Sequence, residues 1–469
     1  MDLYNTIEEC KNASIKGLTF NDYDKYKLYY NVFDSWNDIE NKLLKTYNNP
    51  KFQINNYKNT FINNLKPNFY KQNKNAVRNS LYYMFYKYGS GYYVRIRNGE
   101  LVIFGYLWNP NWINTLSKYL IIDPKYAKKY AYSNKNKWPV LGSMVRVYEK
   151  KYEGYGMDFY YSETKYLLQQ ICKDLPDCDF IVANKDNLVI KKNLTEACEE
   201  IVGNISFPMQ KQFIFNEYCP IFSYCWNERY CDLPLPTPDD ILRIFKLYAP
   251  EKCINNYINL PEISWSKKKP TAVFRGSFTG SSANIKKNPR LNLSMLNYKW
   301  NFDSKYNDKN KIDGIPYLDA GLSSKGGFTR GRKDIDDRYI RFVDNNYWKY
   351  LLVEPLTHEQ QSYYKYIIYV EGNVSAYRGA FLFSIGSVVL WVKSLKYYLW
   401  FEPKLIDNVN CIFIKHDLSD LAEKITWLKQ NDDKASEIAN NGLKFYNEFL
   451  TKEPIINYTI NAISLACNK

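Results

Sequence analysis

Residues 366–392, YIIYVEGNVSAYRGAFLFSIGSVVLWV, contain the pattern that decides the fold class. The first five residues are apolar or aromatic, as in a buried strand, and a glycine-containing loop follows them directly. Ser375 then has the residue type that begins a helix, here predicted over 376–385. Gly386 is suited to end that helix, and 387–392 form a second apolar run. A strand, a loop, a helix and a strand in this order predict a parallel α/β unit.

A second strand of the same unit is predicted at 271–274, where the apolar TAVF runs directly into an Arg-Gly pair. Two helices are predicted to close the unit. Asp420 and Glu423 have the spacing of a capping box at the start of the first helix. In the second, apolar residues recur at helical period over 432–449. Residues 264–452 are therefore predicted to form one Rossmann-like α/β domain.

A similar order of elements precedes this domain. A helix is predicted over 166–173 and a buried strand over 180–183. The polar loop with Asp186 stands just past the C-terminal end of that strand, which is the end where open α/β sheets bind ligands. Residues 141–263 are therefore predicted to form another Rossmann-like domain.

The remaining segments are the two ends of the chain. Residues 1–140 contain a helix-like stretch at 76–88 and a hairpin in which Asn98-Gly99 joins two alternating strands. This segment is predicted to be an α+β extension that recognises an acceptor or a partner. Residues 453–469 are predicted to be a tail or a helix.

The composition excludes several kinds of catalytic centre. The 469 residues carry 64 Lys+Arg against 49 Asp+Glu, a net charge of +15, and 17% of them are aromatic. His358 and His416 are the only two histidines in the sequence, which argues against a histidine-rich zinc site and a Ser–His–Asp triad. The ten cysteines include no C-x-x-C pair for zinc or redox chemistry. Acid–base chemistry is therefore expected from carboxylates, and no metal site is predicted.

Neither a leader peptide nor a membrane span is expected from the sequence. The N-terminal residues lack the apolar core of a secretory signal. The longest apolar run, 379–392, is shorter than the roughly 20 residues that span a bilayer. We therefore expect a cytoplasmic protein. The Asn, Lys, Tyr and Ile bias is typical of an AT-rich genome, so the positive charge alone is weak support for nucleic-acid binding.

Two glycine-containing loops follow strands and could bind a diphosphate. In the loop 371–378, a serine and an arginine stand near the predicted start of a helix, and Glu371 has the residue type that hydrogen-bonds ribose hydroxyls. In the loop 275–280, an arginine offers a bidentate group and the glycines allow close approach of a phosphate. The predicted donor-binding residues are Arg275, Gly276, Ser277, Thr279, Gly280, Arg290, Glu371, Gly372, Ser375, Tyr377 and Arg378.

Each of these features also has a structural interpretation. The glycine spacings of dinucleotide-binding and P-loop proteins are absent. The loop 371–378 could be an ordinary strand–helix turn, and the loop 275–280 could be a salt-bridged surface turn. Asp186 could be a general base, but an Asx turn or a helix cap is also consistent with an aspartate after a strand. Its role depends on what lies opposite it in the fold.

Several motifs in a fixed order add to this interpretation. They are LPDCDF at 175–180 with Asn184-Lys185-Asp186, PIFS at 220–223, YCDLPLP at 230–236, FRGSFTG at 274–280, KYIIYVEG at 365–372, Arg378, and GSVVL at 386–390. Together they resemble glycosyltransferase family 90, which includes the Rumi-like protein O-glucosyltransferases and the capsule-associated xylosyltransferases. The similarity extends from about Val145 to Leu450.

This resemblance implies a GT-B-type α/β fold, in which two Rossmann-like domains face a cleft and the C-terminal one binds a UDP-sugar. It also implies inversion at the anomeric carbon and no essential metal or other cofactor. Asp186 matches the family's catalytic aspartate. Arg275, Ser375 and Arg378 match its diphosphate-binding positions.

The match is less complete at other positions. Rumi-like members carry an arginine where this chain has Phe278, and Arg290 is predicted to take its place. On the acceptor side, Tyr230 and Asp232 match a motif that lines the family's cleft, and Ser223 is predicted to belong to the same side of the cleft.

The sequence therefore predicts a metal-independent, inverting glycosyltransferase from a large DNA virus or a microbe, located in the cytoplasm, or in the host cytoplasm or virion if viral. It would transfer a sugar, glucose or xylose, from a UDP-sugar to a hydroxyl of a protein or glycan. Nucleic acid is not an expected partner. The alternative hypothesis is a non-catalytic basic protein that binds nucleic acid or an anionic glycan. A glycoside hydrolase is less well supported, because no suitable pair of carboxylates is evident.

Overall fold

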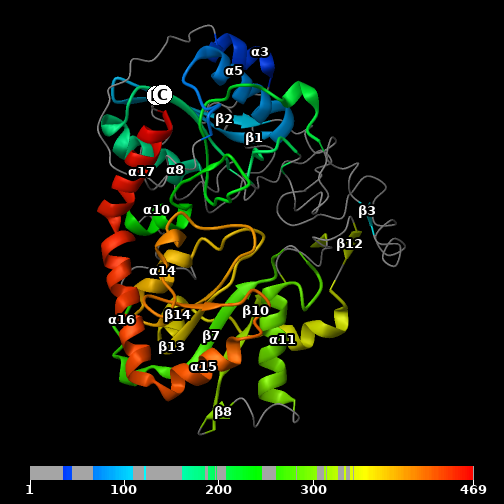
Figure 1. The fold of residues 1–469 in the computed structure, drawn as a ribbon, viewed down its shortest axis with the longest axis vertical. Helices are drawn as coiled ribbons and strands as arrows, with labels where there is room; N and C mark the ends of the chain where they lie inside the picture. The colour runs from blue at the N-terminus through cyan, green and yellow to red at the C-terminus, as the bar shows by residue number, and fades with distance from the viewer. Residues whose placement is uncertain are drawn as a thin grey trace.

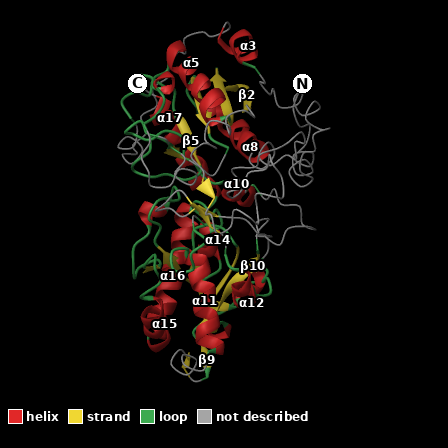
Figure 2. Ribbon diagram, turned by 90° about the vertical axis from the view of Figure 1, so that its right-hand side faces the viewer, coloured by secondary structure: helices red, strands yellow, loops and turns green. Residues whose placement is uncertain are grey.

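Two α/β units lie end to end in the computed structural model of the chain (Figure 1 and Figure 2). The structure describes residues 35–44, 67–108, 121–122, 161–184, 188–195, 197, 208–245, 260–280, 282–303, 311–312, 314–325, 332–333, 339–341 and 343–467. The predicted general base Asp186 lies outside the described residues.

The first unit is built on a mixed five-stranded sheet in the order β2-β1-β4-β5-β6. Its strands are β1 (Ser90–Arg97), β2 (Glu100–Trp108), β4 (Cys178–Val182), β5 (Ile221–Ser223) and β6 (Leu233–Pro234). The last three are parallel, and β1 is antiparallel to both β2 and β4. The predicted hairpin is confirmed: Asn98 and Gly99 have φ angles of 52° and 75°, as a two-residue primed turn requires.

This sheet corrects the predicted separation of an N-terminal extension at residue 140. The hairpin of β1 and β2 falls within that extension, yet Tyr92 pairs with Val182 and Ile96 pairs with Cys178 across the boundary. The hairpin therefore belongs to the first α/β sheet. Pairing with β4 makes β1 an interior strand, and the core on both sides of the sheet buries its side chains up to Ile96.

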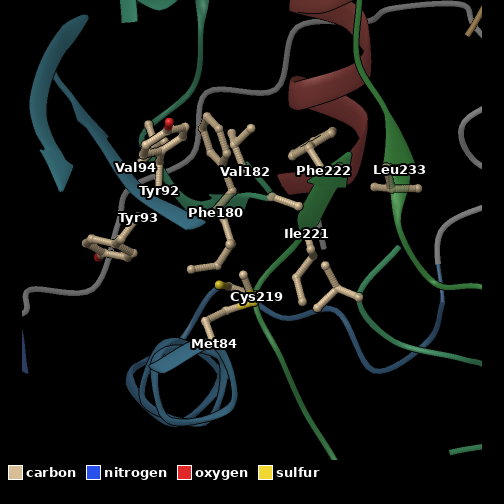
Figure 3. Packing of buried hydrophobic residues seen from close by; sticks show 14 of the residues in the cluster. Met84, Tyr92, Tyr93, Val94, Phe180, Val182, Cys219, Ile221, Phe222 and Leu233 are labelled. Atoms are coloured by element: carbon tan, nitrogen blue, oxygen red, sulfur yellow. The ribbon is translucent and has the colours of Figure 1, made fainter. Parts of the chain in front are cut away.

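The core of the first unit lies on both faces of this sheet. Figure 3 shows the side chains of Tyr92, Phe180 and Phe222 on one face, and those of Tyr93 and Ile221 on the other, as the alternation of a strand requires. These side chains are fully buried. The helical elements around the sheet are α3 (Trp36–Ile39) with a π-helical turn at Glu40–Leu44, α5 (Lys74–Tyr82) with a π-helical turn at Tyr83–Tyr88, α8 (Tyr161–Ile171), and α10 (Pro238–Ile244).

The second unit is built on a fully parallel sheet in the order β10-β7-β13-β14-β15. Its strands are β7 (Lys269–Ser277), β10 (Leu318–Ser324), β13 (Tyr364–Tyr369), β14 (Val388–Val392) and β15 (Ile412–Ile414). In chain order this arrangement is 2-1-3-4-5, so the order reverses between β7 and β13. The predicted two-unit α/β architecture of GT-B type is confirmed.

Helices cover both faces of the second sheet. They are α11 (Pro289–Phe302), α12 (Trp348–Leu351), α13 (His358–Ser362), α14 (Gly379–Ser384), α15 (Leu421–Gln430) and α16 (Asp432–Phe449). Leu293 of α11 and Ile425 of α15 pack with Phe274 and Leu390 in one core. Residues 380–383 of α14 pack with Val389 in the core on the opposite face.

The helix after β13 begins later than the sequence predicts. Ser375 does not cap it, because α14 starts at Gly379. The N–H of Ala376 donates to the hydroxyl of Tyr369 at 3.0 Å, and the N–H of Gly379 donates to the carbonyl of Ala376 at 3.1 Å, so a turn precedes the helix. A Cβ atom at Gly379 would lie 2.5 Å from Cδ1 of Leu399. The first residue of α14 therefore has no room for a side chain.

The capping box predicted at Asp420 and Glu423 is also wrong. Asp420 does occupy the N-cap position of α15, but it makes no side-chain cap there. Its carboxylate accepts instead from the backbone N–H of Lys415 at 3.0 Å. Oδ1 of Asp420 thus bonds to the loop before α15 and not to the N–H groups of the first helical turn.

The C-terminal segment, predicted to be a tail or a helix, forms the helix α17 (Lys452–Cys467). Figure 1 shows α16 and α17, in red and orange, running along one side of both units. Ile460, Ile463 and Cys467 of α17 are buried in the core of the first unit. Elsewhere, Trp226 and Tyr398 exchange two backbone hydrogen bonds of 2.9 Å each between the units. The two units are thus joined by packing as well as by the chain.

The remaining described elements are short. They are β3 (Ile121–Ile122), β8 (Lys311–Ile312), β9 (Ile315–Pro316), β11 (Arg332–Lys333) and β12 (Tyr339–Arg341), with 3-10 turns at Cys172–Asp174, Lys211–Phe213, Trp265–Lys267, Asn345–Tyr347 and Glu402–Lys404. Of the helices in the described part of the chain, none combines the length and the hydropathy needed to cross a membrane.

Candidate functional site

The carboxyl ends of β7 and β13 meet where the strand order of the second sheet reverses, which is where doubly wound sheets bind ligands. The loops 275–280 and 371–378 both begin there. They are directly joined, because the N–H of Gly280 donates to Oδ1 of Asn373 at 3.0 Å. The fold therefore brings together the two loops that the sequence singles out.

The glycines in these loops are required by close packing. A Cβ atom at Gly372 would lie 2.8 Å from Oγ1 of Thr279 and 3.2 Å from Nη2 of Arg290. Gly280 has a φ of +112°, and a Cβ atom there would lie 2.7 Å from Nδ2 of Asn288. A larger residue at Gly372 would press on Thr279 of the other loop, and one at Gly280 would have a strained backbone and would displace Asn288.

Arg290, on the first turn of α11, connects the ends of β7 and β13. Its guanidinium donates to the carbonyl oxygens of Ser277 at 2.9 Å, Val370 at 3.1 Å and Glu371 at 2.8 Å. Burial, together with the positive charge of Arg378, lowers the pKa of Arg290 to about 9. The sequence predicts that Arg290 binds the donor in place of a missing arginine. Its contacts show a guanidinium that holds the two strand ends together.

Phe278 occupies the position of that missing arginine, and it is fully buried. It packs edge-on against Trp348 with the ring centroids 5.4 Å apart. Leu291 and Leu322 belong to the same apolar cluster. The side chain at this position thus contributes to packing between α11, α12 and β10.

Arg275 is also engaged within the fold. Its Nη2 lies 2.7 Å from Oδ1 of Asp319 on β10, and its Nε donates to the carbonyl of Glu354 at 2.7 Å. The hydroxyl of Tyr364 donates to the other oxygen of Asp319 at 2.5 Å. These contacts fix β7 to β10, so Arg275 shapes the site through the strand that carries it.

Arg378, half-buried just before α14, lies at the same place from the opposite loop. Its Nη1 donates to the carbonyl of Arg275 at 2.5 Å, and its guanidinium carbon lies 5.1 Å from the centre of the Phe274 ring. Burial and the charge of Arg378 together lower the pKa of His358 to about 3. Arg378 therefore contacts the end of β7 and acts electrostatically on His358 of α13.

Two buried hydroxyl groups lie in the same loops. Among the residues that the structure describes, neither Oγ1 of Thr279 nor Oγ of Ser375 has a hydrogen-bond partner. Thr279 follows β7, and Ser375, 4% exposed, follows β13. A buried hydroxyl without a partner is unusual in a folded protein. Both groups are able to donate to a ligand oxygen at the switch point.

Two further predicted residues have different surroundings. Ser277 is exposed, and Ser324 of β10 donates to its hydroxyl at 2.9 Å. Tyr377 packs between the cores of the two units, with its ring centroid 6.1 Å from that of Tyr224. Tyr377 therefore lies at the junction between the units.

Glu371, the residue after Val370 at the end of β13, is paired with side chains that the sequence did not single out. Its Oε2 accepts a short hydrogen bond from the hydroxyl of Ser394, and its Oε1 lies 3.9 Å from Nδ1 of His416. Ser394 follows β14 and His416 follows β15. Ser394 and His416 could have been identified from the sequence, because each is a polar residue shortly after a predicted or apolar strand, at the end where such sheets bind ligands.

The predicted acceptor-side residues Ser223 and Asp232 form a buried network. Oδ1 of Asp232 accepts from the hydroxyl of Ser223 and from the N–H of Val189, both at 2.7 Å, and Oδ2 accepts from the N–H of Ile190 at 3.1 Å. Asp232 is 3% exposed. The two side chains thus hold the backbone of 189–190, shortly after Asp186 in the chain.

Tyr230 lies where this segment contacts the second unit. Its hydroxyl donates to the carbonyl of Ala197 at 2.6 Å, and its ring packs in a cluster with Leu188 and Val374. Val374 belongs to the loop after β13. The described residue nearest to Asp186 on its C-terminal side, Leu188, is therefore in the same cluster as the loop predicted to bind the donor.

The Asp232 network predicts a pH-dependent contribution to stability. Burial raises the pKa of Asp232 from 3.8 to about 6, although hydrogen bonds from Ser223, Ile190 and Val189 oppose this shift. The folded state therefore binds the Asp232 proton more tightly than the unfolded state does. The contribution of this proton to the free energy of unfolding is complete below pH 3.8 and is lost as the pH rises through 6. Between these limits, the free energy of unfolding of wild type relative to Asp232→Asn is expected to fall by roughly 2–3 kcal/mol. Denaturant titrations across this range measure it, and a constant difference would contradict it.

Within the described part of the chain, no group of three or more His, Cys, Asp or Glu side chains is arranged to hold a metal ion.

Comparison with known proteins gives three kinds of match. A family model described as "Glycosyl transferase family 90" matches residues 139–465. The chain is 29% identical over 456 residues to "Uncharacterized protein 179R" of Invertebrate iridescent virus 6, covering 84% of this chain and 37% of that protein. It is 32% identical over 200 residues to human "Protein O-glucosyltransferase 1", covering 43% of this chain and 42% of that protein.

The chain spans about two fifths of the length of these curated relatives. Among solved structures, it is similar to TarM with a TM-score of 0.28 and 15% sequence identity, covering 44% of this chain and 38% of that chain.

Proposed function

The chain belongs to glycosyl transferase family 90, and from this membership we propose that it transfers a sugar from a UDP-sugar to a hydroxyl group of a protein or glycan. The observation that supports binding of the UDP-sugar donor is the point between β7 and β13 where the strand order of the second sheet reverses. There, two loops pack so closely that their glycines have no room for a side chain. These loops carry the buried hydroxyls of Thr279 and Ser375 and the half-buried Arg378. Relatives named protein O-glucosyltransferase make glucose the first sugar to test, with xylose as the second.

The diphosphate of the donor is proposed to bind at the loops 275–280 and 371–378. Arg378 supplies a positive charge, and the hydroxyls of Thr279 and Ser375 supply hydrogen-bond donors that the fold leaves unused among its described residues. Arg290 adds a second positive charge at the ends of the same strands. These groups would stabilise the charge of the departing UDP, so no divalent ion is required.

Asp186 is proposed to act as the general base. It would take the proton from the acceptor hydroxyl as that oxygen forms a bond to the anomeric carbon, while the bond from this carbon to the UDP oxygen breaks. A direct displacement of this kind inverts the anomeric centre. The support for Asp186 is its match to the family position and its place two residues before Leu188, which packs with Val374 of the donor loop.

A binding experiment tests the donor half of this proposal. The melting temperature of the protein is measured in EDTA with UDP, UDP-glucose or UDP-xylose. A ligand at about a hundred times its Kd adds about 2.7 kcal/mol to the stability of the folded state. We expect stabilisation by UDP in EDTA, and the rank order of the sugars indicates the donor.

Either of two results would count against the proposal. The first is that no uridine nucleotide stabilises the protein, and the second is that stabilisation or turnover appears only after Mg²⁺ or Mn²⁺ is added. Salt-sensitive binding of a polyanion without UDP binding would instead favour a non-catalytic binding protein.

A further inference from the structure

Three consecutive strands of the second sheet place a polar side chain at the same edge. Glu371 follows β13, Ser394 follows β14 and His416 follows β15. Because these strands are parallel neighbours, their carboxyl ends lie side by side. The three side chains therefore form one row beside the loop 371–378.

The hydroxyl of Ser394 has a fixed direction in this row. Its oxygen accepts from the backbone N–H groups of Lys396 at 3.0 Å and of Tyr397 at 2.9 Å. With two donors already pointing at the oxygen, the single proton of the hydroxyl is directed to Oε2 of Glu371. A carboxylate oxygen held in this way is oriented, and the other oxygen, Oε1, faces His416.

His416 is placed to affect the charge of Glu371. Its Nδ1 lies 3.9 Å from Oε1 of Glu371 and 3.2 Å from the carbonyl oxygen of Lys393. The side chains of Glu371 and His416 are 15% and 22% exposed, so both are within reach of a ligand. Histidine is the side chain that ordinarily changes charge between pH 5 and 8.

The ionisation of Glu371 depends on these neighbours. Burial raises the pKa of the Glu371 carboxyl, whereas the hydrogen bond from Ser394 and the positive charges of His416 and Lys396 lower it. Arg290 acts in the same direction. The other titratable groups that interact with Glu371 are Tyr369, Tyr398 and Glu402, and the neighbours of His416 in its own loop are Lys415 and Asp417.

We propose that Ser394 and His416 are positioning residues that keep Glu371 ionised and aimed at the ribose hydroxyls of the donor nucleotide. This inference rests on the proposed UDP-sugar site. An ionised carboxylate accepts strong hydrogen bonds from two hydroxyls, whereas a protonated one loses part of this capacity. His416 acts through Glu371 and needs no contact with the ligand.

The experiment compares UDP with 2′-deoxy-UDP and 3′-deoxy-UDP by calorimetry, in wild type, Glu371→Gln and His416→Gln. Removing one hydroxyl that donates to a carboxylate is expected to weaken binding by about 10-fold or more. In Glu371→Gln the affinity ratio of UDP to the weaker deoxy analogue should approach one. In His416→Gln this ratio should fall severalfold at mildly acidic pH, where an imidazole ordinarily carries a positive charge. Lys415→Gln, an exposed cation beside His416, is the matched control and should keep the wild-type ratio.

The pH profile gives a second readout. Loss of the positive charge of His416 raises the pKa of Glu371. As the pH is lowered, the ratio of UDP affinity to deoxy-UDP affinity should therefore begin to fall at a higher pH in His416→Gln than in wild type. Substituting Ser394 is less informative, because it would also leave the N–H groups of Lys396 and Tyr397 without their acceptor.

The outcomes separate the two proposals. If wild type does not bind UDP, the proposed function itself fails. If wild type binds UDP but His416→Gln keeps the wild-type ratio and pH profile, His416 is not a positioning residue and the proposed function stands. An equal loss of affinity for UDP and both deoxy analogues in His416→Gln would indicate a structural role and would also overturn the inference.

Discussion

Replacing Asp186 with asparagine is expected to reduce sugar transfer by about 10²–10⁴-fold, the usual contribution of a general base. The amide keeps the size of the side chain but cannot accept the proton of the acceptor hydroxyl. UDP binding should not change, because the donor groups are in the loops 275–280 and 371–378 of the second unit. The measurement is UDP release from UDP-glucose or UDP-xylose with water as the acceptor, together with calorimetry of UDP.

Two controls make this result specific. Asp433→Asn removes a carboxylate from the exposed side of α16 and should leave both turnover and UDP affinity at wild-type values. Asp232→Asn should lower stability through the backbone of 189–190, and any loss of turnover there should follow the loss of folded protein. An Asp186→Asn protein that retains near wild-type turnover would exclude this residue as the base.

The sequence predicts the strands well because their pattern is local. The apolar run at 366–370 and its neighbour at 387–392 correspond to β13 and β14, and the Asn98-Gly99 turn sets the first hairpin. These features depend on alternation, burial and turn chemistry within a few residues. Because β7 and β13 are parallel neighbours in the second sheet, the two glycine-containing loops that follow them lie side by side at its carboxyl end.

The errors arise where distant residues compete for the same atoms. Ser375 has the residue type of a helix cap, but the hydroxyl of Tyr369 takes the N–H of Ala376 and delays the helix. Arg275 has the residue type of a phosphate ligand, yet Asp319 on a neighbouring strand is paired with it. Neither partner is marked by a residue pattern. Tyr369, seven residues before Ala376, has only the pattern of a buried strand residue, and Asp319 lies 44 residues from Arg275 on another strand.

The same reason explains which site residues were missed. Ser394 and His416 each follow a strand, but neither has a motif of its own, and their common partner Glu371 is known only once β13, β14 and β15 are placed side by side. The hairpin of β1 and β2 could not be assigned to the first sheet from sequence either. Its pairing with β4 spans a long stretch of intervening chain.

Among the three arginines predicted to bind the diphosphate, Arg378 is the one on which donor affinity is expected to depend directly. Arg275 and Arg290 are each 8% exposed and bond to Asp319 and to backbone carbonyls, so removing either would leave buried acceptors without donors. Arg378 is half-buried just before α14, three residues after Ser375 in the same loop, and its Nη1 bonds to the carbonyl of Arg275 at the end of β7.

We therefore expect Arg378→Ala to weaken UDP binding by about 10–100-fold, the range for a lost hydrogen bond to a charged group. UMP, which lacks the β-phosphate, should lose less affinity than UDP. Arg378→Lys should recover part of the loss, since it restores the charge without the planar fork. Lys415→Ala, an exposed cation at the same edge, should change UDP affinity little at physiological salt.

Calorimetry of UDP and UMP on these variants distinguishes direct diphosphate binding from loss of structure. If Arg378→Ala weakened UDP and UMP equally, the arginine would act through the fold, where its Nη1 holds the carbonyl of Arg275. The positive charge at the diphosphate would then have to come from elsewhere. A selective loss for UDP would place the β-phosphate at the carboxyl ends of β7 and β13, where Gly372 packs closely against Thr279 of the other loop.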